Sequence, residues 1–130
     1  MIKEHCMSDF PEFVITMSHN KTNEKQVTLA FVMGLKSLEK GYKTAIILML
    51  DGVHVGRSGY VDGIDIGEPF LPVKDMLEAY LGEGGQLLAC GSCWKHDHLP
   101  ENELLAGAAM VSADRVIDLL MNAKTTLQLN

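Results

Sequence analysis

Ala45-Ile46-Ile47-Leu48-Met49-Leu50 is an unbroken apolar run, and it decides the fold class. A strand with one face in water alternates apolar and polar residues, whereas a strand covered on both faces is apolar throughout. The run therefore predicts a strand within 43–50 that lies in a parallel sheet with helices on both sides. A shorter apolar run, Phe13 to Met17, predicts another strand upstream of it.

The segment between these two runs carries the signals of one long helix, over about 23–40. Asn23 followed three residues later by Gln26 resembles a capping box, and Gly41 suits the position just after the last turn. The helix has more apolar residues than one face can hold. Those outside the core-facing stripe are Leu29, Val32 and Met33. Because a large exposed apolar patch is unusual in a monomer, we expect a homo-oligomer.

Glycine, proline and capping residues divide the rest of the chain. Five glycines between 51 and 68 predict a long loop, of a kind that is usually a lid, a binding loop or disordered. The other predicted elements are a helix from Pro72 to Leu81, a strand at 86–89, a helical turn at 101–105, a strand at 108–111, a helix capped by Ser112 and a strand at 125–129.

Strands that alternate with helices predict a single α/β domain, 1–130, in which a five-stranded, mostly parallel sheet is the middle layer of an α/β/α sandwich. The flavodoxin-like strand order 2-1-3-4-5 is the commonest at this size, and it would bring the loop at 18–23 beside Cys90. Residues 1–12 are expected to form a flexible N-terminal segment. Cys6, within that segment, is expected to be an incidental exposed thiol.

Composition and charge exclude several classes of function. The chain has 130 residues and a formal net charge of -6, with no cluster of lysine and arginine, so a nucleic-acid partner is not expected. No apolar stretch reaches the roughly 18 residues of a spanning helix, and residues 1–13 lack the apolar core of a signal peptide. Three cysteines do not suit a secreted disulfide scaffold. We therefore expect a soluble, cytoplasmic protein with no membrane partner.

A pair of cysteines closes a further apolar run, Leu87-Leu88-Ala89-Cys90-Gly91-Ser92-Cys93-Trp94. Cys90 falls where the predicted strand opens into a loop, and open α/β sheets carry their sites at that edge. Gly91 and Ser92 are small enough for a tight turn that brings the second thiol to the first. The pair suits thiol–disulfide exchange, sulfur transfer or metal ligation. The alternative is that Cys90 is only a small buried side chain of the core.

The residues after the pair leave further alternatives open. Lys95 and His96 are cationic neighbours of the kind that lower a thiol pKa. With His98 added, the segment offers a Cys₂His₂ zinc set of Cys90, Cys93, His96 and His98, although so short a span makes tetrahedral closure difficult. A thioredoxin-like motif follows the first strand and starts a long helix, whereas this pair follows the third predicted strand and precedes a polar, turn-like stretch. The sequence has no phosphate-binding loop, and no cofactor is expected.

Three motifs, in order along the chain, carry a resemblance to a known family. They are Ser37-Leu38-Glu39-Lys40-Gly41-Tyr42-Lys43, Asp51-Gly52-Val53 and Leu87-Leu88-Ala89-Cys90. Through them the chain resembles the DsrE/DsrF-like (DsrE/TusD sulfur-relay) family from Phe13 to the last strand. The resemblance implies the family's three-layer subunit with flavodoxin-like topology, assembly into homotrimers or homohexamers, and a persulfide carried on Cys90. After Cys90 the sequence departs from the relay proteins, which continue into an apolar, arginine-containing helix.

The leading hypothesis is a sulfur carrier or sulfurtransferase. Cys90, as a thiolate, would attack a sulfane sulfur donor and hold a persulfide, because the thiolate is the nucleophilic form. Cys93 would release the sulfur by forming a disulfide with Cys90, or pass the persulfide on. The expected partners are sulfur donor and acceptor proteins or small sulfane sulfur compounds. Around the thiols, the candidate cations are His19, Lys21, Lys95 and His96, and the candidate pocket residues are Asp51 and His54.

The second hypothesis belongs to a different class of protein. It is a non-enzymatic module that holds a metal or a small ligand between the cysteines and the glycine-rich loop. In that case Cys90 and Cys93 would act as ligands rather than as nucleophiles.

Overall fold

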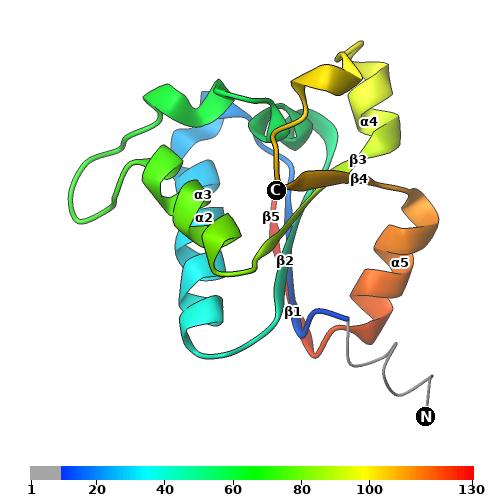
Figure 1. Ribbon diagram of the computed structural model, residues 1–130, viewed down its shortest axis with the longest axis horizontal. Coiled ribbons are helices and arrows are strands. Elements are labelled where there is room, and N and C mark those ends of the chain that lie inside the picture. The colour runs from blue at the N-terminus through cyan, green and yellow to red at the C-terminus, as the bar shows by residue number, and fades with distance from the viewer. Residues whose placement is uncertain (1–9) are drawn as a thin grey trace.

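Five parallel strands form one sheet at the centre of the protein (Figure 1). The computed structural model describes residues 10–130. Its strands are β1 (Phe13–Met17), β2 (Thr44–Leu48), β3 (Gln86–Cys90), β4 (Ala108–Val111) and β5 (Thr125–Leu129). Its helices are α2 (Glu24–Glu39), α3 (Val73–Gly82), α4 (Gly91–His96) and α5 (Ala113–Asn122).

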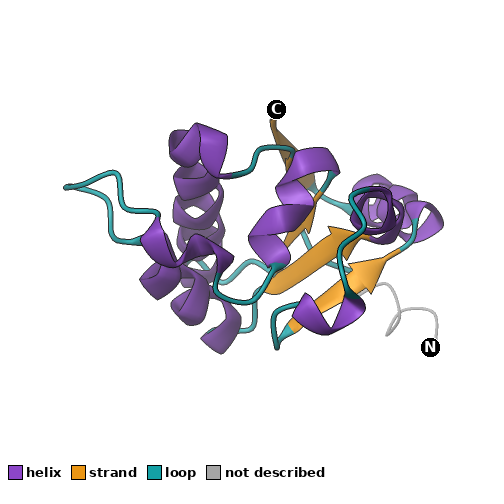
Figure 2. Ribbon diagram, turned by 90° about the horizontal axis from the view of Figure 1, so that it is seen from above, coloured by secondary structure: helices purple, strands orange, loops and turns teal. Residues whose placement is uncertain are grey.

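The predicted fold class is confirmed, since helices cover both sides of the parallel sheet (Figure 2). The predicted strand order 2-1-3-4-5 is wrong, because the observed order is β4-β3-β2-β1-β5. From β1 to β4 the chain steps in one direction, so right-handed crossovers carry α2 and α3 over the same face. The chain then returns to set β5 beside β1, and α5 covers the opposite face (Figure 1). Consequently β2, and not β1, lies next to β3.

Burial on both faces of the sheet explains the unbroken apolar run of β2. Ile46 and Leu48 pack in the core on the α2 and α3 side, while Ile47 packs in the core on the α5 side, and all three are fully buried. This division arises because successive side chains of a strand point to opposite faces. On the α2 and α3 side, the rings of Phe31 and Tyr80 meet edge to face with their centres 6.1 Å apart.

Helix α2 has the predicted ends and the predicted apolar surplus. The Asn23 side chain accepts a hydrogen bond from the Gln26 N–H at 3.3 Å, and Gly41 has a φ of 91°. Leu29 and Met33 are each 38% exposed. The apolar surplus of the helix therefore lies at the surface of the single chain.

The glycine-rich segment 51–68 is only partly a loop. Its first part, with Leu50, forms the 3-10 turn Leu50–Gly56, in which Val53 and Val55 are fully buried. A Cβ atom on Gly52 would collide with the carbonyl oxygen of Met17, so this turn lies directly against the end of β1. This first part of the segment is core structure rather than a lid.

Of the predicted N-terminal segment 1–12, the structure describes residues 10–12. Phe10 lies under the guanidinium of Arg115 at 4.8 Å, Pro11 is buried, and the Glu12 N–H donates to the Lys43 carbonyl at 2.8 Å. These three residues thus contact the body of the domain. The rest of that segment, with Cys6, lies outside the described residues. Within 10–130, no helix has the length and apolar character needed to cross a membrane.

Candidate functional site

The two thiols lie where β3 passes into α4. Cys90 is the last residue of the strand and the N-cap residue of the helix, and Cys93 is the third helical residue. The prediction of a polar, turn-like stretch at 94–100 is wrong for its first part, because α4 occupies Gly91–His96. Trp94 anchors this short helix: its ring is 1% exposed, and its Nε1–H donates to the Pro100 carbonyl at 3.2 Å.

The Cys-x-x-Cys pair therefore opens a helical turn, which brings the two side chains together. Both cysteines are half-buried and neither is in a disulfide. The thiol of Cys93 is hydrogen-bonded to Cys90. On its other side, the Cys93 sulfur accepts a hydrogen bond from the backbone N–H of Leu50 at 3.2 Å. A dithiol with one internal hydrogen bond is the arrangement from which a disulfide or a thiolate–thiol pair forms.

The surroundings of Cys93 favour its protonated form. Burial raises the pKa of the Cys93 thiol first, and its hydrogen bond to Cys90 raises it further. The hydrogen bond from the Leu50 N–H lowers the pKa of Cys93, while the charges of Cys90 and Asp97 raise it. The Cys93 thiol therefore resists loss of its proton.

Asp97, which the sequence analysis missed, links two histidines beside the pair. Its Oδ2 lies 2.8 Å from His54 Nε2, and its Oδ1 lies 3.3 Å from His96 Nδ1. The hydrogen bond to His54, followed by the one to His96, lowers the pKa of the Asp97 carboxyl. Arg57 Nη1 lies 3.2 Å from His54 Nδ1. Because a guanidinium only donates, Nδ1 accepts, and the His54 proton on Nε2 faces Asp97.

A cavity of about 390 Å³ opens beside the thiols. Its walls come from the loop after β2 and from α4, and they include Cys93 but not Cys90. The lining residues are Leu50, Asp51, Ser92, Cys93, His96 and Asp97. Leu50 was also missed by the sequence analysis; it has a φ of 52°, in the left-handed region that a leucine rarely adopts. That conformation accompanies the contact between its N–H and the Cys93 sulfur.

The predicted pocket residues divide into two groups. Asp51 and His96 line the cavity, and His54 reaches it through its hydrogen bond to Asp97. Lys95 lines a separate cavity of about 390 Å³ with Trp94, and the exposed His98 lines neither cavity.

The predicted cations from the loop after β1 are not among the residues that line the cavity. Lys21 lies over the Tyr60 ring at 4.8 Å, and the half-buried His19 has a ring Nε2 without a hydrogen-bond partner among the described residues. The expectation that 18–23 faces Cys90 depended on a strand order that the protein does not have. Because β2 pairs with β3, the loop after β2 takes that place instead.

The zinc alternative is not supported by the geometry. Among residues 10–130, no three His, Cys, Asp or Glu side chains gather so that they could hold a metal ion. The predicted set of Cys90, Cys93, His96 and His98 therefore does not form a ligand cluster. The imidazole of His96 bonds to Asp97 instead of turning to the thiols.

Comparison with known proteins adds a family and a fold. The model of the DsrE/DsrF-like family matches residues 12–129. The ychN protein of E. coli has a similar structure, with a TM-score of 0.69 and 17% identity over 91% of this chain and 98% of its own. A protein of unknown function from Methanobacterium thermoautotrophicum gives a TM-score of 0.68 and 17% identity over 89% of this chain and 96% of its own. No curated protein sequence matches.

Proposed function

The chain belongs to the DsrE/DsrF-like family, and on that premise we propose that it is a sulfur carrier or sulfurtransferase that holds a persulfide on Cys90. The family by itself suggests a role of the sulfur-relay type. One observation carries the finer proposal: Cys90 is the last residue of β3 and is fixed by the sheet, with Cys93 beside it in the first turn of α4. The pKa of the Cys93 thiol is raised, so Cys93 suits the resolving role, and the proposal assigns the nucleophilic thiolate to Cys90.

The loading step is a displacement at sulfur. The Cys90 thiolate attacks the outer sulfur of a sulfane donor such as a persulfide or thiosulfate. A new S–S bond forms on Cys90 as the S–S bond of the donor breaks, and the donor leaves with the electron pair as a thiolate or as sulfite. No net oxidation occurs, because one S–S bond replaces another.

Two unloading steps are open to the persulfide. An acceptor thiolate can attack the terminal sulfur, which regenerates Cys90 as a thiolate. Alternatively, Cys93 attacks the inner sulfur of Cys90, a Cys90–Cys93 disulfide forms, and the terminal sulfur leaves as hydrosulfide. In the second case two cysteines are oxidised while the sulfane sulfur is reduced, so a reductant must reopen the disulfide before the next cycle.

The cavity supports a role for the loop after β2 and for α4 in admitting donors or acceptors. It reaches Cys93, so a group that enters the cavity meets the resolving thiol, which lies one helical turn from Cys90. Asp97, held by His54, contributes to keeping Cys93 protonated until Cys90 has been loaded. Asp51 and the exposed His96 lie on the wall and offer one acidic and one basic contact to a partner.

We also propose that the protein works as a homotrimer or homohexamer in the cytoplasm, with sulfur donor and acceptor proteins or small sulfane sulfur compounds as its partners. The exposed apolar side chains of α2, Leu29 and Met33, support self-association. A reducing compartment suits two cysteines that are both free.

The test is mass spectrometry of the intact protein after exposure to thiosulfate or polysulfide, followed by peptide mapping. The expected product is one added sulfur atom on the peptide that contains Cys90, removed by dithiothreitol. Protein that stays unmodified over a range of donors would refute the proposed function.

A further inference from the structure

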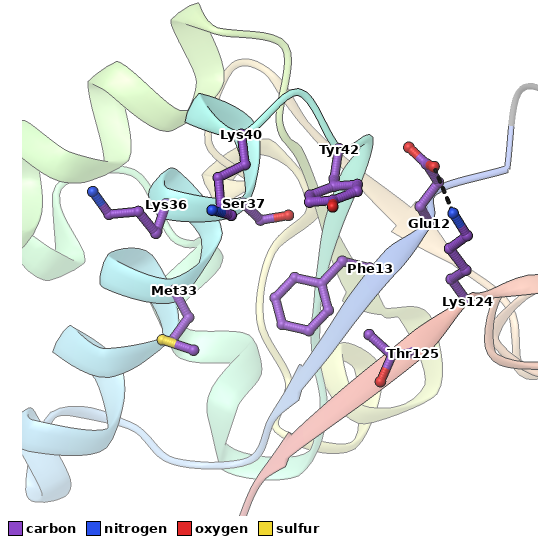
Figure 3. Close-up of a pocket in the computed structure, with 9 residues that line it drawn as sticks. All are labelled: Glu12, Phe13, Met33, Lys36, Ser37, Lys40, Tyr42, Lys124 and Thr125. Carbon is purple, nitrogen blue, oxygen red and sulfur yellow. Dashed lines mark ion pairs between the residues drawn. The ribbon is translucent and has the colours of Figure 1, made fainter.

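A groove opens between α2 and the edge strand β5 (Figure 3). It lies at the amino ends of β1 and β5, whereas the thiols follow the carboxyl end of β3. Its volume is about 420 Å³. In Figure 3 the ring of Phe13, from β1, lies between Met33 of α2 and Thr125 of β5. Tyr42 closes the groove above that ring. These side chains give the groove an apolar floor that is open to solvent.

Lysines surround this floor. Lys36, Lys40 and Lys124 all line the groove, against one acidic residue, Glu12. Lys124 pairs loosely with Glu12 at 3.9 Å, and Lys36 pairs with Glu39 at 3.0 Å. Lys40 has no ion-pair partner within the part of the chain that the structure describes. The groove is thus apolar in its floor and positively charged at its rim.

A loop with the opposite character projects from the same chain. The segment 64–73 leaves the body of the protein before α3 (Figure 1). At its outer part Phe70 is 39% exposed and Leu71 is 60% exposed. The loop also carries two exposed carboxylates, Asp65 and Glu68. Large apolar side chains beside acidic ones, on a projecting loop, are what a basic-rimmed apolar groove would accept.

The loop is held in shape before any contact. At its base the Val73 N–H donates to the Ile64 carbonyl at 3.0 Å, and both residues are almost fully buried. Near its tip the Phe70 N–H donates to the Gly67 carbonyl at 3.0 Å, and the Gly67 N–H donates to the Asp65 side chain at 3.0 Å. A loop that is already ordered loses little conformational entropy when it binds.

We propose that the groove of one copy receives the 64–73 loop of a second copy. Phe70 and Leu71 would cover Phe13 and Met33, while Asp65 and Glu68 face the lysine rim. Opposite charges across such a contact fix its orientation and favour the right partner over others. This inference rests on the homo-oligomer proposed above and is independent of the sulfur chemistry proposed for Cys90.

The contact joins two different surfaces of the chain, so it is heterologous. Repeated from copy to copy, a heterologous contact closes into a ring or grows into a filament. In the homotrimer or homohexamer proposed above, the loop-into-groove contact would repeat from copy to copy around a closed ring. Leu29, one helical turn before Met33 on α2, extends the apolar surface that the arriving copy would cover.

Sedimentation of the full chain tests the apolar part of the contact. Phe70→Ser in the loop and Met33→Ser in the groove should each shift the assembly toward monomer, with association weakened about tenfold or more by loss of a buried apolar side chain. Met121→Ser, on the exposed face of α5, is the matched control and should sediment as the wild type does. A wild-type chain that is monomeric at micromolar concentration would overturn the proposal, as would an assembly that neither variant weakens.

Exchanging the charges of the groove and the loop tests whether these two surfaces pair, and it leaves the apolar side chains of the contact in place. Lys40→Glu and Glu68→Lys, both at exposed positions, should each weaken association about tenfold or more, and the double variant should recover most of the loss. Failure of the double variant to recover would contradict the pairing of these two surfaces. If the groove instead bound anilinonaphthalene sulfonate in the intact assembly, and Lys40→Glu abolished that binding, the groove would be a small-molecule site and the proposal would be wrong.

Discussion

The backbone N–H of Leu50 lies 3.2 Å from the Sγ of Cys93, and this contact joins the loop after β2 to the thiol pair after β3. Strands β2 and β3 are neighbours in register, with Leu48 opposite Ala89, so their carboxyl ends emerge side by side. The adjacency of the two strands thus places Leu50 and Asp51 against α4 and forms the cavity. The site follows from the strand order, and a different order would place other residues beside the cysteines.

Mild oxidation should join Cys90 and Cys93 in a reversible disulfide. The N-cap and third positions of a helical turn bring the two side chains together, and their thiols are already hydrogen-bonded. Peptide mapping of protein treated with oxidised glutathione checks this, and dithiothreitol should restore both thiols. A bridge to Cys6, or two free thiols after treatment, would count against it.

Removal of Cys90 should make Cys93 more acidic. In Cys90→Ala the hydrogen bond and the neighbouring charge that raise the pKa of Cys93 are both gone, while burial remains. The pKa should therefore fall toward its ordinary value, and alkylation of Cys93 by iodoacetamide should begin at lower pH than in the wild type. Asp97→Asn should shift the same profile in the same direction but less, since its charge is the smallest of the named causes. An unchanged or rising midpoint in Cys90→Ala would contradict the effect of Cys90 on the pKa of Cys93.

Asp97 should stabilise the folded chain only at pH values above the pKa of its carboxyl. Its pKa is lowered in the folded chain, chiefly by the hydrogen bond to His54, so the folded state holds its proton less tightly than the unfolded state does. The contribution to the free energy of unfolding is therefore full at neutral pH and lost as the pH falls through the folded pKa. Asp97→Asn should lower Tm at neutral pH, and the difference should shrink at acid pH, as the pH falls through the lowered pKa of the folded chain.

Asp118→Asn, on the exposed surface of α5, is the control for this comparison and should leave Tm unchanged at both pH values. A Tm difference between Asp97→Asn and wild type that stays constant from neutral to acid pH would show that the carboxylate charge does not matter.

Trp94 should be essential to the position of the thiols. Trp94→Ala removes a fully buried ring, which typically costs about 3–5 kcal/mol in the free energy of unfolding. Trp94→Phe keeps an aromatic ring but loses the hydrogen bond to the Pro100 carbonyl, so it should be destabilised less. Urea unfolding measures both variants. If Trp94→Ala unfolds at the same urea concentration as the wild type, α4 is not anchored by this ring.

Local signals in the sequence were sufficient for most elements of the fold. The apolar run at 45–50, the Asn23 cap and the Ser112 cap predicted elements that the structure contains. The strand order was not predictable in the same way. Whether β5 returns beside β1 or beside β4 depends on which sheet edge it reaches across α5, and no nearby residue specifies that choice.

The candidate site was predicted only in part, because the sequence shows residues that are close along the chain but not those that the fold brings together. The cysteine pair is visible because its two members are close in sequence, and Asp51 directly follows the apolar run 45–50. Asp97 was missed because its partner, His54, lies 43 residues earlier, and a lone aspartate in a polar stretch has the pattern of a solvated turn. Helix α4 was missed because six residues hold too few apolar positions for a helical period. Trp94 was its one signal, an aromatic side chain in an otherwise polar segment.

The most direct measurement compares the intact masses of Cys90→Ser, Cys93→Ser and the double variant after exposure to a sulfane sulfur donor. Cys90→Ser should gain no sulfur. Cys93→Ser should retain the added sulfur or accumulate it, because the resolving thiol is gone. The double variant should gain none, which excludes Cys6 as the acceptor. If Cys90→Ser gains sulfur while Cys93→Ser does not, Cys93 is the acceptor and the assignment of the persulfide to Cys90 is contradicted.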